Sequence, residues 1–158
     1  MTLRLSQGHV AIIDAHDAER VGRHSWHAVK AKKTFYARTQ IEGRAVYLHR
    51  FVVNAEPGRT VDHVNHDGLD CRKENLRLAT MTEQNANQRK RAGGSSRFKG
   101  VHQWVNRGKI RWRAGVQISG RQYRVSCATE HEAALAYNRL ARQHFGQFAA
   151  LNDVGPAC

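Results

Sequence analysis

The chain has 158 residues, a length that allows one ordinary domain or two small ones. Its 26 Lys and Arg residues against 13 Asp and Glu give a formal net charge of +13 and a pI near 10.5. No stretch approaches the ~20 consecutive apolar residues of a membrane helix, and the first residues lack the apolar core of a signal peptide. Three widely spaced cysteines argue against a disulfide framework and against a four-cysteine zinc site. These features predict a soluble cytoplasmic protein without a membrane partner, and nucleic acid is the first candidate partner.

The positive charge is unevenly distributed along the chain. Residues 1–87 carry a net charge of +3 and seven of the ten histidines, whereas residues 88–158 carry +10. The two parts meet in a basic run followed by Gly-Gly-Ser-Ser, which predicts a flexible linker over residues 89–97. The composition therefore predicts a His-rich N-terminal part and a strongly basic C-terminal part.

The N-terminal part is predicted to be rich in short strands. Apolar and aromatic residues favour strands over 9–14, 25–30 and 34–41, and the last of these meets 45–48 across a turn at Glu42-Gly43-Arg44. Two further strands, over 59–63 and 75–79, flank a polar loop. The spacing Thr80-x-x-Glu83 is that of a capping box and predicts a helix starting near Glu83.

The C-terminal part has the pattern of a sheet covered on one side. Strands are predicted over 98–105, 110–118 and 122–127, and a second capping box at Thr129-x-x-Glu132 predicts a helix that ends near residue 144. The middle strand alternates apolar and polar residues, so the helix should cover its apolar face. The outer face carries Arg111, Arg113 and Gln117, with Arg121 and Arg124 on the next strand, and Lys99 and Lys109 suit phosphates. Such a row favours base reading in DNA, and the alternative for any one residue is a solvated basic surface.

Four polar residues of the N-terminal part form a candidate hydrolytic site. Asp62 and Asn85 supply hard oxygen atoms suited to Mg²⁺, and the His63 imidazole can take a proton from water near neutral pH. Asn75 could hold that imidazole in one tautomer. The alternative is a loop turn or a surface ion pair with solvated asparagines, and residue spacing alone does not separate a nuclease from an inert domain.

A resemblance to a known family favours the nuclease. The segments 47–53, 61–80 and 84–87, which include Asp62-His63 and Asn75-Leu-Arg-Leu, closely resemble the HNH endonucleases of phages and mobile introns. They are most similar to the variety in which the final His is Asn. The resemblance implies that Asp62 is a metal ligand, His63 the general base, Asn75 the residue that orders the loop, and Asn85 the second ligand.

One departure from the family pattern concerns the second ligand. The family usually has this Asn nine residues after the middle Asn, whereas here the ninth residue is Gln84 and the tenth is Asn85. Either one residue is inserted or Gln84 takes the ligand position. His49, Arg50 and His66 are left outside the predicted catalytic set.

Residues 97–152 resemble a second family, the Apetala-two (ethylene-response-factor) DNA-binding domain. The resemblance rests on Phe98-Lys-Gly-Val101, on 112–117, on 129–137 and on Phe145-Gly-Gln-Phe-Ala149. It implies a three-stranded sheet laid in the major groove. The implied DNA contacts are Lys99, His102, Trp104, Arg113, Gly115, Gln117 and Arg124. Gly115 stands where a longer side chain is frequent, so one contact would be missing.

Together these inferences predict an α+β protein of homing-endonuclease type that hydrolyses a phosphodiester bond in double-stranded DNA with Mg²⁺ or Mn²⁺. The predicted organisation is a β-rich extension (1–44), a ββα-metal HNH module (45–88), the linker, an Apetala-two-like domain (98–152) and a tail (153–158). A monomer with no obligatory protein partner, in the cytoplasm of a bacterium or phage-infected cell, would nick one strand. The alternatives are a DNA-binding regulator with a degenerate HNH module and, third, an RNA-binding protein.

Overall fold

The computed structural model describes residues 1–31, 34–90 and 92–155. The chain forms two compact units, residues 1–80 and 81–158, and each is described by itself below. Residue 91 of the predicted linker and residues 156–158 of the predicted tail lie outside the described residues. Both units combine small antiparallel sheets with short helices, so the predicted α+β class is confirmed. Among the described residues, no helix is long and apolar enough to span a membrane.

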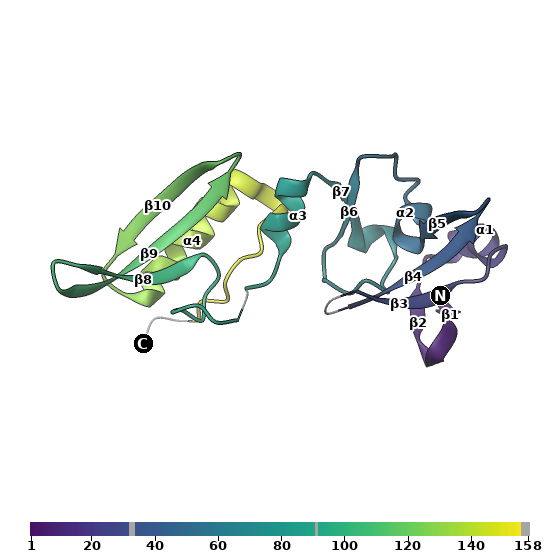
Figure 1. Cartoon of the computed structure of the whole chain (residues 1–158), viewed down its shortest axis with the longest axis horizontal. Helices are drawn as coiled ribbons and strands as arrows, with labels where there is room; N and C mark the ends of the chain where they lie inside the picture. The colour runs from purple at the N-terminus through teal and green to yellow at the C-terminus, as the bar shows by residue number, and fades with distance from the viewer. Residues whose placement is uncertain (32–33, 91, 156–158) are drawn as a thin grey trace. The chain divides into compact units, whose positions relative to one another are not determined.

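The described residues of the N-terminal unit form three small antiparallel sheets, paired β1-β2, β3-β4-β5 and β6-β7 (Figure 1). Its strands are β1 (Thr2–Arg4), β2 (Val10–Ile12), β3 (His27–Ala31), β4 (Thr34–Ile41), β5 (Arg44–Tyr47), β6 (Thr60–His63) and β7 (Leu76–Ala79). Its helices are the 3-10 turns η1 (Ser6–Gly8), η2 (Ala15–Asp17) and η3 (Lys73–Asn75) and the α-helices α1 (Ala18–Gly22) and α2 (Leu48–Val52). The predicted hairpin between β4 and β5 is confirmed, with Glu42 and Gly43 at φ 49° and 73°, as its tight turn requires.

The sequence did not predict α2, because residues 45–48 were assigned to a strand. Leu48 instead begins α2, and Leu48 and Val52 are buried one helical turn apart in the core of this unit. They pack with Ile13, Val21 and Trp26, whose indole nitrogen donates to the Val21 carbonyl at 2.9 Å. Burial thus overrides the strand propensity of this short apolar run. The helix fixes His49 and Arg50 beside the core.

The C-terminal unit has one sheet of order β10-β9-β8 with helix α4 against it (Figure 1). Its elements are α3 (Met81–Asn87), β8 (Val101–Asn106), β9 (Lys109–Ile118), β10 (Arg121–Cys127), α4 (Glu130–Phe145) and η4 (Gly146–Phe148). The capping box at the start of α4 is confirmed, since Thr129 accepts from the Glu132 amide and the Glu132 carboxylate accepts from the Thr129 amide. The predicted sheet backed by one helix is therefore confirmed.

Small residues let α4 approach the sheet closely. Ala133 and Tyr137 of α4 and Ala114 and Val116 of β9 are all buried in this core. Gly100, at φ 66°, lies under the Tyr137 ring, and a Cβ added there would be 2.2 Å from that ring. The backbone can pass at this point only because residue 100 has no side chain.

Two segments that the sequence analysis assigned to the linker and to the nuclease module contact the C-terminal unit. The predicted linker includes Ser96, which is buried and donates from its hydroxyl to Glu130 at 2.6 Å, so this end of the segment is held by α4. Helix α3, predicted as part of the nuclease module, also belongs to this unit, and its Ala86 carbonyl accepts from the Ala150 amide at 3.3 Å. The exact bounds of the predicted module and linker remain predictions.

Candidate active site

The β6-β7 hairpin carries the two residues predicted to do the chemistry. In its register Asp62 lies opposite Arg77 and His63 opposite Leu76. Asp62 and His63 are each only 6% exposed, which is unusual for ionisable side chains without a partner or a function. Neighbouring strand residues alternate between faces, and His63 is the last residue of β6, where strand pairing ends.

The Asn75 side chain holds the loop between these strands together. Its Oδ1 accepts from the Asn65 amide at 3.0 Å, and its Nδ2 donates to the Asp70 carbonyl at 2.8 Å. The Val64 amide donates to the Asn75 carbonyl, so both ends of the loop are joined at this residue. These contacts involve loop backbone, whereas the sequence also suggested that Asn75 could hold the imidazole. The loop-ordering role is the one that the geometry supports.

Arg77 is a neighbour of the candidate site that sequence reasoning missed. Its Nε and Nη2 atoms donate to Asp62 Oδ2 at 2.9 and 2.7 Å, and both side chains are largely buried. The pairing could have been predicted from the sequence, because the antiparallel register of the two predicted strands brings residues 62 and 77 directly opposite each other. The pair neutralises a buried carboxylate and fixes its position on the hairpin.

His63 lies in a cluster of aromatic rings from other elements. The His49 ring of α2 meets it edge-on with centroids 5.0 Å apart, and the Tyr36 ring of β4 lies 5.7 Å away. Tyr47 stacks on His49 at 5.6 Å. Burial raises the pKa of Tyr36, and the Asp62 charge adds to this effect, so the carboxylate acts on the same phenol that contacts His63. The structure thus brings His49, which the sequence analysis left out, next to the predicted base.

Burial keeps both imidazoles of this cluster neutral at physiological pH. It lowers the pKa of His49 to about 3, with smaller contributions from His63 and Arg50. Burial also lowers the pKa of His63, against the opposing effect of Asp62, Asp67 and Asp70. A neutral imidazole can accept a proton, which is the state that a general base requires.

The donor set around Asp62 is compatible with a hard divalent cation. Mg²⁺ is commonly held through one or two carboxylates while it retains several waters and binds substrate phosphate oxygens. Asp62 offers one such carboxylate, but Arg77 already donates twice to its Oδ2, so a cation would share the carboxylate with Arg77 or replace it. The predicted second ligand, Asn85 or Gln84, lies on α3 in the other unit, and its approach to Asp62 remains a prediction.

A separate group of ligand-bearing side chains lies at Asp14, His16 and Asp17, whose donor atoms all fall within 4.8 Å of one another. The cationic side chains of Lys73 and Arg20 already contact this group. Lys73 Nζ lies 2.6 Å from His16 Nε2 and 3.4 Å from Asp17 Oδ2, and Arg20 donates to Asp17 Oδ1. The ion pairs neutralise Asp17, and the Asp14 carboxylate accepts from the Lys73 backbone amide.

In the C-terminal unit, the strand register sorts the predicted DNA contacts by face. His102 pairs with Arg113, Trp104 with Arg111, Gln122 with Gln117 and Arg124 with Gly115, which places these residues on the sheet face away from α4. Arg113 lies over the Trp104 ring, with its Cζ 4.0 Å from the ring centroid. Arg121 pairs with Ile118 and so lies on the opposite face, contrary to the expectation that it continues the row.

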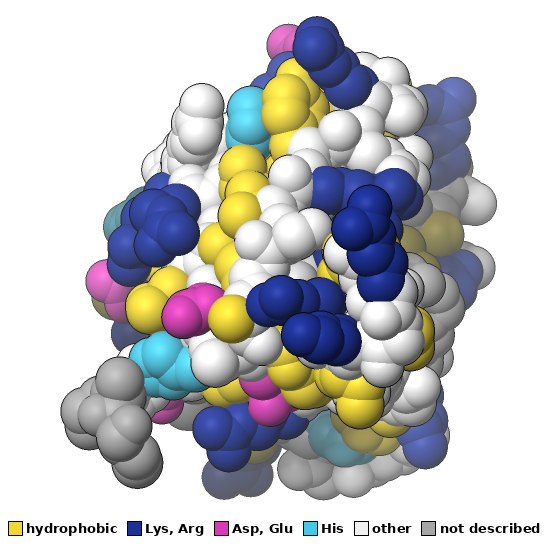
Figure 2. Space-filling view, turned by 90° about the vertical axis from the view of Figure 1, so that its left-hand side faces the viewer, with side chains coloured by type: hydrophobic (Ala, Val, Ile, Leu, Met, Phe, Trp, Pro, Cys, Tyr) yellow, Lys and Arg dark blue, Asp and Glu magenta, His cyan; other side chains and the backbone are white. Residues whose placement is uncertain are grey.

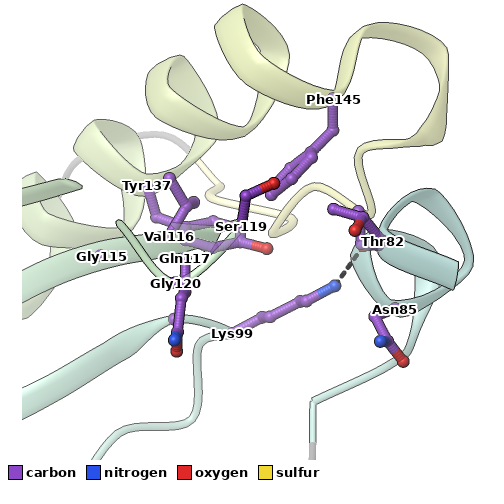
Figure 3. A pocket seen from close by; sticks show the side chains of 12 residues that line it. Thr82, Asn85, Lys99, Gly115, Val116, Gln117, Ser119, Gly120, Tyr137 and Phe145 are labelled. Carbon is purple, nitrogen blue, oxygen red and sulfur yellow. Dashed lines mark hydrogen bonds between the residues drawn. The ribbon is translucent and has the colours of Figure 1, made fainter. Parts of the chain in front are cut away.

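Lys99 has a structural partner instead of an open position on the sheet. Its ammonium donates to the Ala86 carbonyl near the end of α3, and Figure 3 shows the side chain extended toward that helix. Burial lowers the pKa of Lys99 to about 8. The side chain borders a cleft of about 440 Å³, also lined by Thr82, Asn85, Gln117, Tyr137 and Phe145. Asn85 Oδ1 accepts from the Gln88 side chain at 2.8 Å, so this predicted ligand is engaged within α3 and the turn after it.

Comparison with known proteins identifies one part of the chain. Residues 46–86 match the model of an HNH endonuclease family. The chain is also 35% identical over 95 residues to an uncharacterized HNH endonuclease of Acanthamoeba polyphaga mimivirus, an alignment that covers 60% of this chain and 47% of that protein. The chain therefore spans about half the length of the curated relative it matches. No solved structure matches it. The segment that matches the HNH endonuclease family thus includes Asp62, His63 and Asn75.

Proposed function

We propose that the protein is a site-specific DNA endonuclease of homing type that hydrolyses a phosphodiester bond in duplex DNA with Mg²⁺ or Mn²⁺. The observation that carries the proposal is the buried, neutral His63 beside Asp62 on the β6-β7 hairpin of a segment that matches HNH endonucleases. A desolvated imidazole with adjacent carboxylate charge is suited to accept a proton from an attacking water.

In the proposed reaction, the His63 imidazole takes one proton from water as the oxygen attacks phosphorus. The bond between phosphorus and the 3′ oxygen breaks, and the departing oxygen receives its proton from solvent. Asp62 would hold the cation, with Asn85 or Gln84 as the second protein ligand. When bound, such an ion stabilises negative charge on the phosphate and on the leaving oxygen. Asn75 keeps the loop, and with it the end of β6, in one conformation.

The basic sheet is proposed to bind the target. The face away from α4 carries His102, Trp104, Arg111, Arg113, Gln117 and Arg124, and the segment 98–129 contains no Asp or Glu. Arginine and glutamine side chains of this kind pair with base edges in the major groove, while the surrounding cations attract phosphates. Lys99 is proposed to act on binding through its contact with α3.

The alternative is a DNA-binding protein without nuclease activity. One observation favours it specifically: Arg77 occupies Asp62 Oδ2 with two hydrogen bonds and so neutralises the carboxylate that would attract the cation. A regulator with a decayed site would bind the same DNA and leave it intact.

Metal-dependent cleavage separates the two functions. The purified full chain is incubated with a supercoiled plasmid library of randomised sites, with Mg²⁺ or with EDTA, and nicked products are sequenced. We expect nicks at a defined site with Mg²⁺ only, loss of nicking in Asp62→Asn, and retention in the control Glu42→Gln, which alters an exposed carboxylate at the β4-β5 turn. Binding without nicking under any divalent cation would favour the regulator.

A further inference from the structure

The β8-β9 hairpin ends in an exposed pair of apolar side chains. Val105 and Ile110 lie directly opposite each other and are 67% and 60% exposed. The turn between them has Arg107 and Gly108 at φ 48° and 73°, the geometry of a tight two-residue hairpin turn. The chain therefore holds two β-branched side chains at a rigid, protruding tip, seen as the turn joining β8 to β9 in Figure 1.

This pair continues the apolar face of the sheet beyond the part that α4 covers. Val101 and Ala114 form the buried pair at the covered end of the same two strands. Residues 105 and 110 lie at even spacing from them along β8 and β9, and so on the same face, but near the turn they are left in water. Strand propensity alone does not explain them, because a polar β-branched residue such as Thr would satisfy it. Exposed apolar side chains kept together in this way indicate a contact surface.

The charge around the tip defines its partner. Arg107 lies in the turn, Lys109 begins β9 directly after it, and Arg111 lies on the face of β9 opposite to Ile110. The segment 98–129 contains no acidic residue. Figure 2 views this end of the chain and shows apolar side chains among many Lys and Arg side chains, with some acidic and His side chains beside them. This combination favours a partner that is anionic on its surface and apolar inside. Duplex DNA has this construction, with phosphates outside and stacked base pairs within.

We propose that the β8-β9 tip is a wedge that inserts the Val105 and Ile110 side chains between adjacent base pairs and bends the DNA. Arg107, in the turn, and Lys109, next to it, hold the phosphates on either side of the opened step. Apolar side chains used in this way by DNA-bending proteins unstack a base step and kink the duplex by roughly 20–90°. The proposal shares with the proposed function only the assumption that the chain binds duplex DNA.

The test measures DNA distortion with the full chain in EDTA, so that it is independent of cleavage. The probe is a 30-bp duplex of mixed sequence with a central TpA step flanked by 2-aminopurine, and with a fluorescent donor and acceptor at its ends. TpA is used because it is among the most easily unstacked steps. Binding should raise the 2-aminopurine emission, which reports unstacking, and should increase energy transfer, which reports bending.

Three variants distinguish the wedge from simple charge attraction. The double variant Val105→Ser/Ile110→Ser should lose both signals and bind about tenfold more weakly, with the salt dependence of binding unchanged. Lys109→Ala should keep both signals and reduce the slope of log K against log[salt] by about 1. The matched control Val125→Ser removes a 38%-exposed apolar side chain of β10 and should behave like the wild type.

Several results would overturn the wedge. The wild type could bind the duplex without a change in 2-aminopurine emission or energy transfer. The double variant could give both signals unchanged. The wild type could also fail to bind duplex DNA. A second copy of the chain is the competing occupant, and sedimentation velocity detects it as a dimer that the double variant dissociates while both DNA signals persist. Cleavage by a protein that gives neither signal would reject the wedge and leave the proposed nuclease function intact.

Discussion

Acidification should destabilise the N-terminal unit through His49. Its pKa is about 3 in the folded protein and 6.5 in the unfolded chain, so the unfolded state takes up the proton first as pH falls. Between pH 6.5 and 3, each unit of acidification should lower the free energy of unfolding by about 1.4 kcal/mol. At pH 5 the loss attributable to His49 is therefore about 2 kcal/mol. Above pH 6.5 the contribution is constant.

Amide hydrogen exchange measures this loss in each unit separately. Protection of β6 and β7 is compared at pH 7 and pH 5 after correction for the intrinsic exchange rate, with β9 of the other unit as the internal reference. His49→Gln, which cannot titrate, should remove about 2 kcal/mol of the pH dependence in the hairpin and leave β9 unchanged. The part that remains comes from His63, whose pKa is also lowered. An NMR titration in which His49 protonates near pH 6.5, or a variant with the wild-type pH dependence, would refute the reasoning.

Three further substitutions test other contacts. Arg77→Met leaves the Asp62 carboxylate buried and unpaired, which should lower the free energy of unfolding in urea by about 3–5 kcal/mol. Mg²⁺ should restore part of this stability because the cation replaces the lost positive charge. No effect of Mg²⁺ would argue against a metal at Asp62. Gly100→Ala forces a Cβ against the Tyr137 ring and should cost about 2–4 kcal/mol in thermal unfolding of the C-terminal unit, and an unchanged Tm would show that this close approach is wrong. Lys99→Met removes the hydrogen bond to α3 and should increase hydrogen exchange in α3 with little change in the salt slope of DNA binding, whereas a slope reduced by about 1 would assign Lys99 to a phosphate.

The sequence predicted best where local pattern and tertiary burial agree. The alternation along β9 and the capping box at Thr129 fix the sheet, the helix and the face that the helix covers, and all three are observed. The hairpin β6-β7 was predicted for the same reason, because two short apolar strands flank a polar loop. In each case the spacing of the apolar residues along the chain indicates both the type of element and the side that is buried.

Two errors have different origins, one in contacts between residues far apart in the sequence and one in the register that a tight turn sets. Residues 48–52 have too few positions for a helical period to show, and their helix is decided by burial against Ile13 and Trp26. Arg121 is displaced to the other face because the register after the Ser119-Gly120 turn sets the alternation of β10.

In the candidate site, too, local sequence indicates some residues and the fold brings in others. Its hairpin residues Asp62, His63 and Asn75 were proposed from the resemblance to HNH endonucleases, and their roles remain predictions. His49 was left out because it is 14 residues from His63 and reaches it only through the fold. Arg77 was missed because strand register, and not sequence distance, makes it the partner of Asp62.

The most direct test of the central claim is the single-turnover rate of DNA strand cleavage by His63→Ala at saturating protein and Mg²⁺. If His63 is the general base, the rate should fall by about 10²–10⁴ while the Kd for the same DNA in EDTA is unchanged. The control His27→Ala, an exposed histidine of β3, should cleave at the wild-type rate. Cleavage by His63→Ala at the wild-type rate would contradict the account.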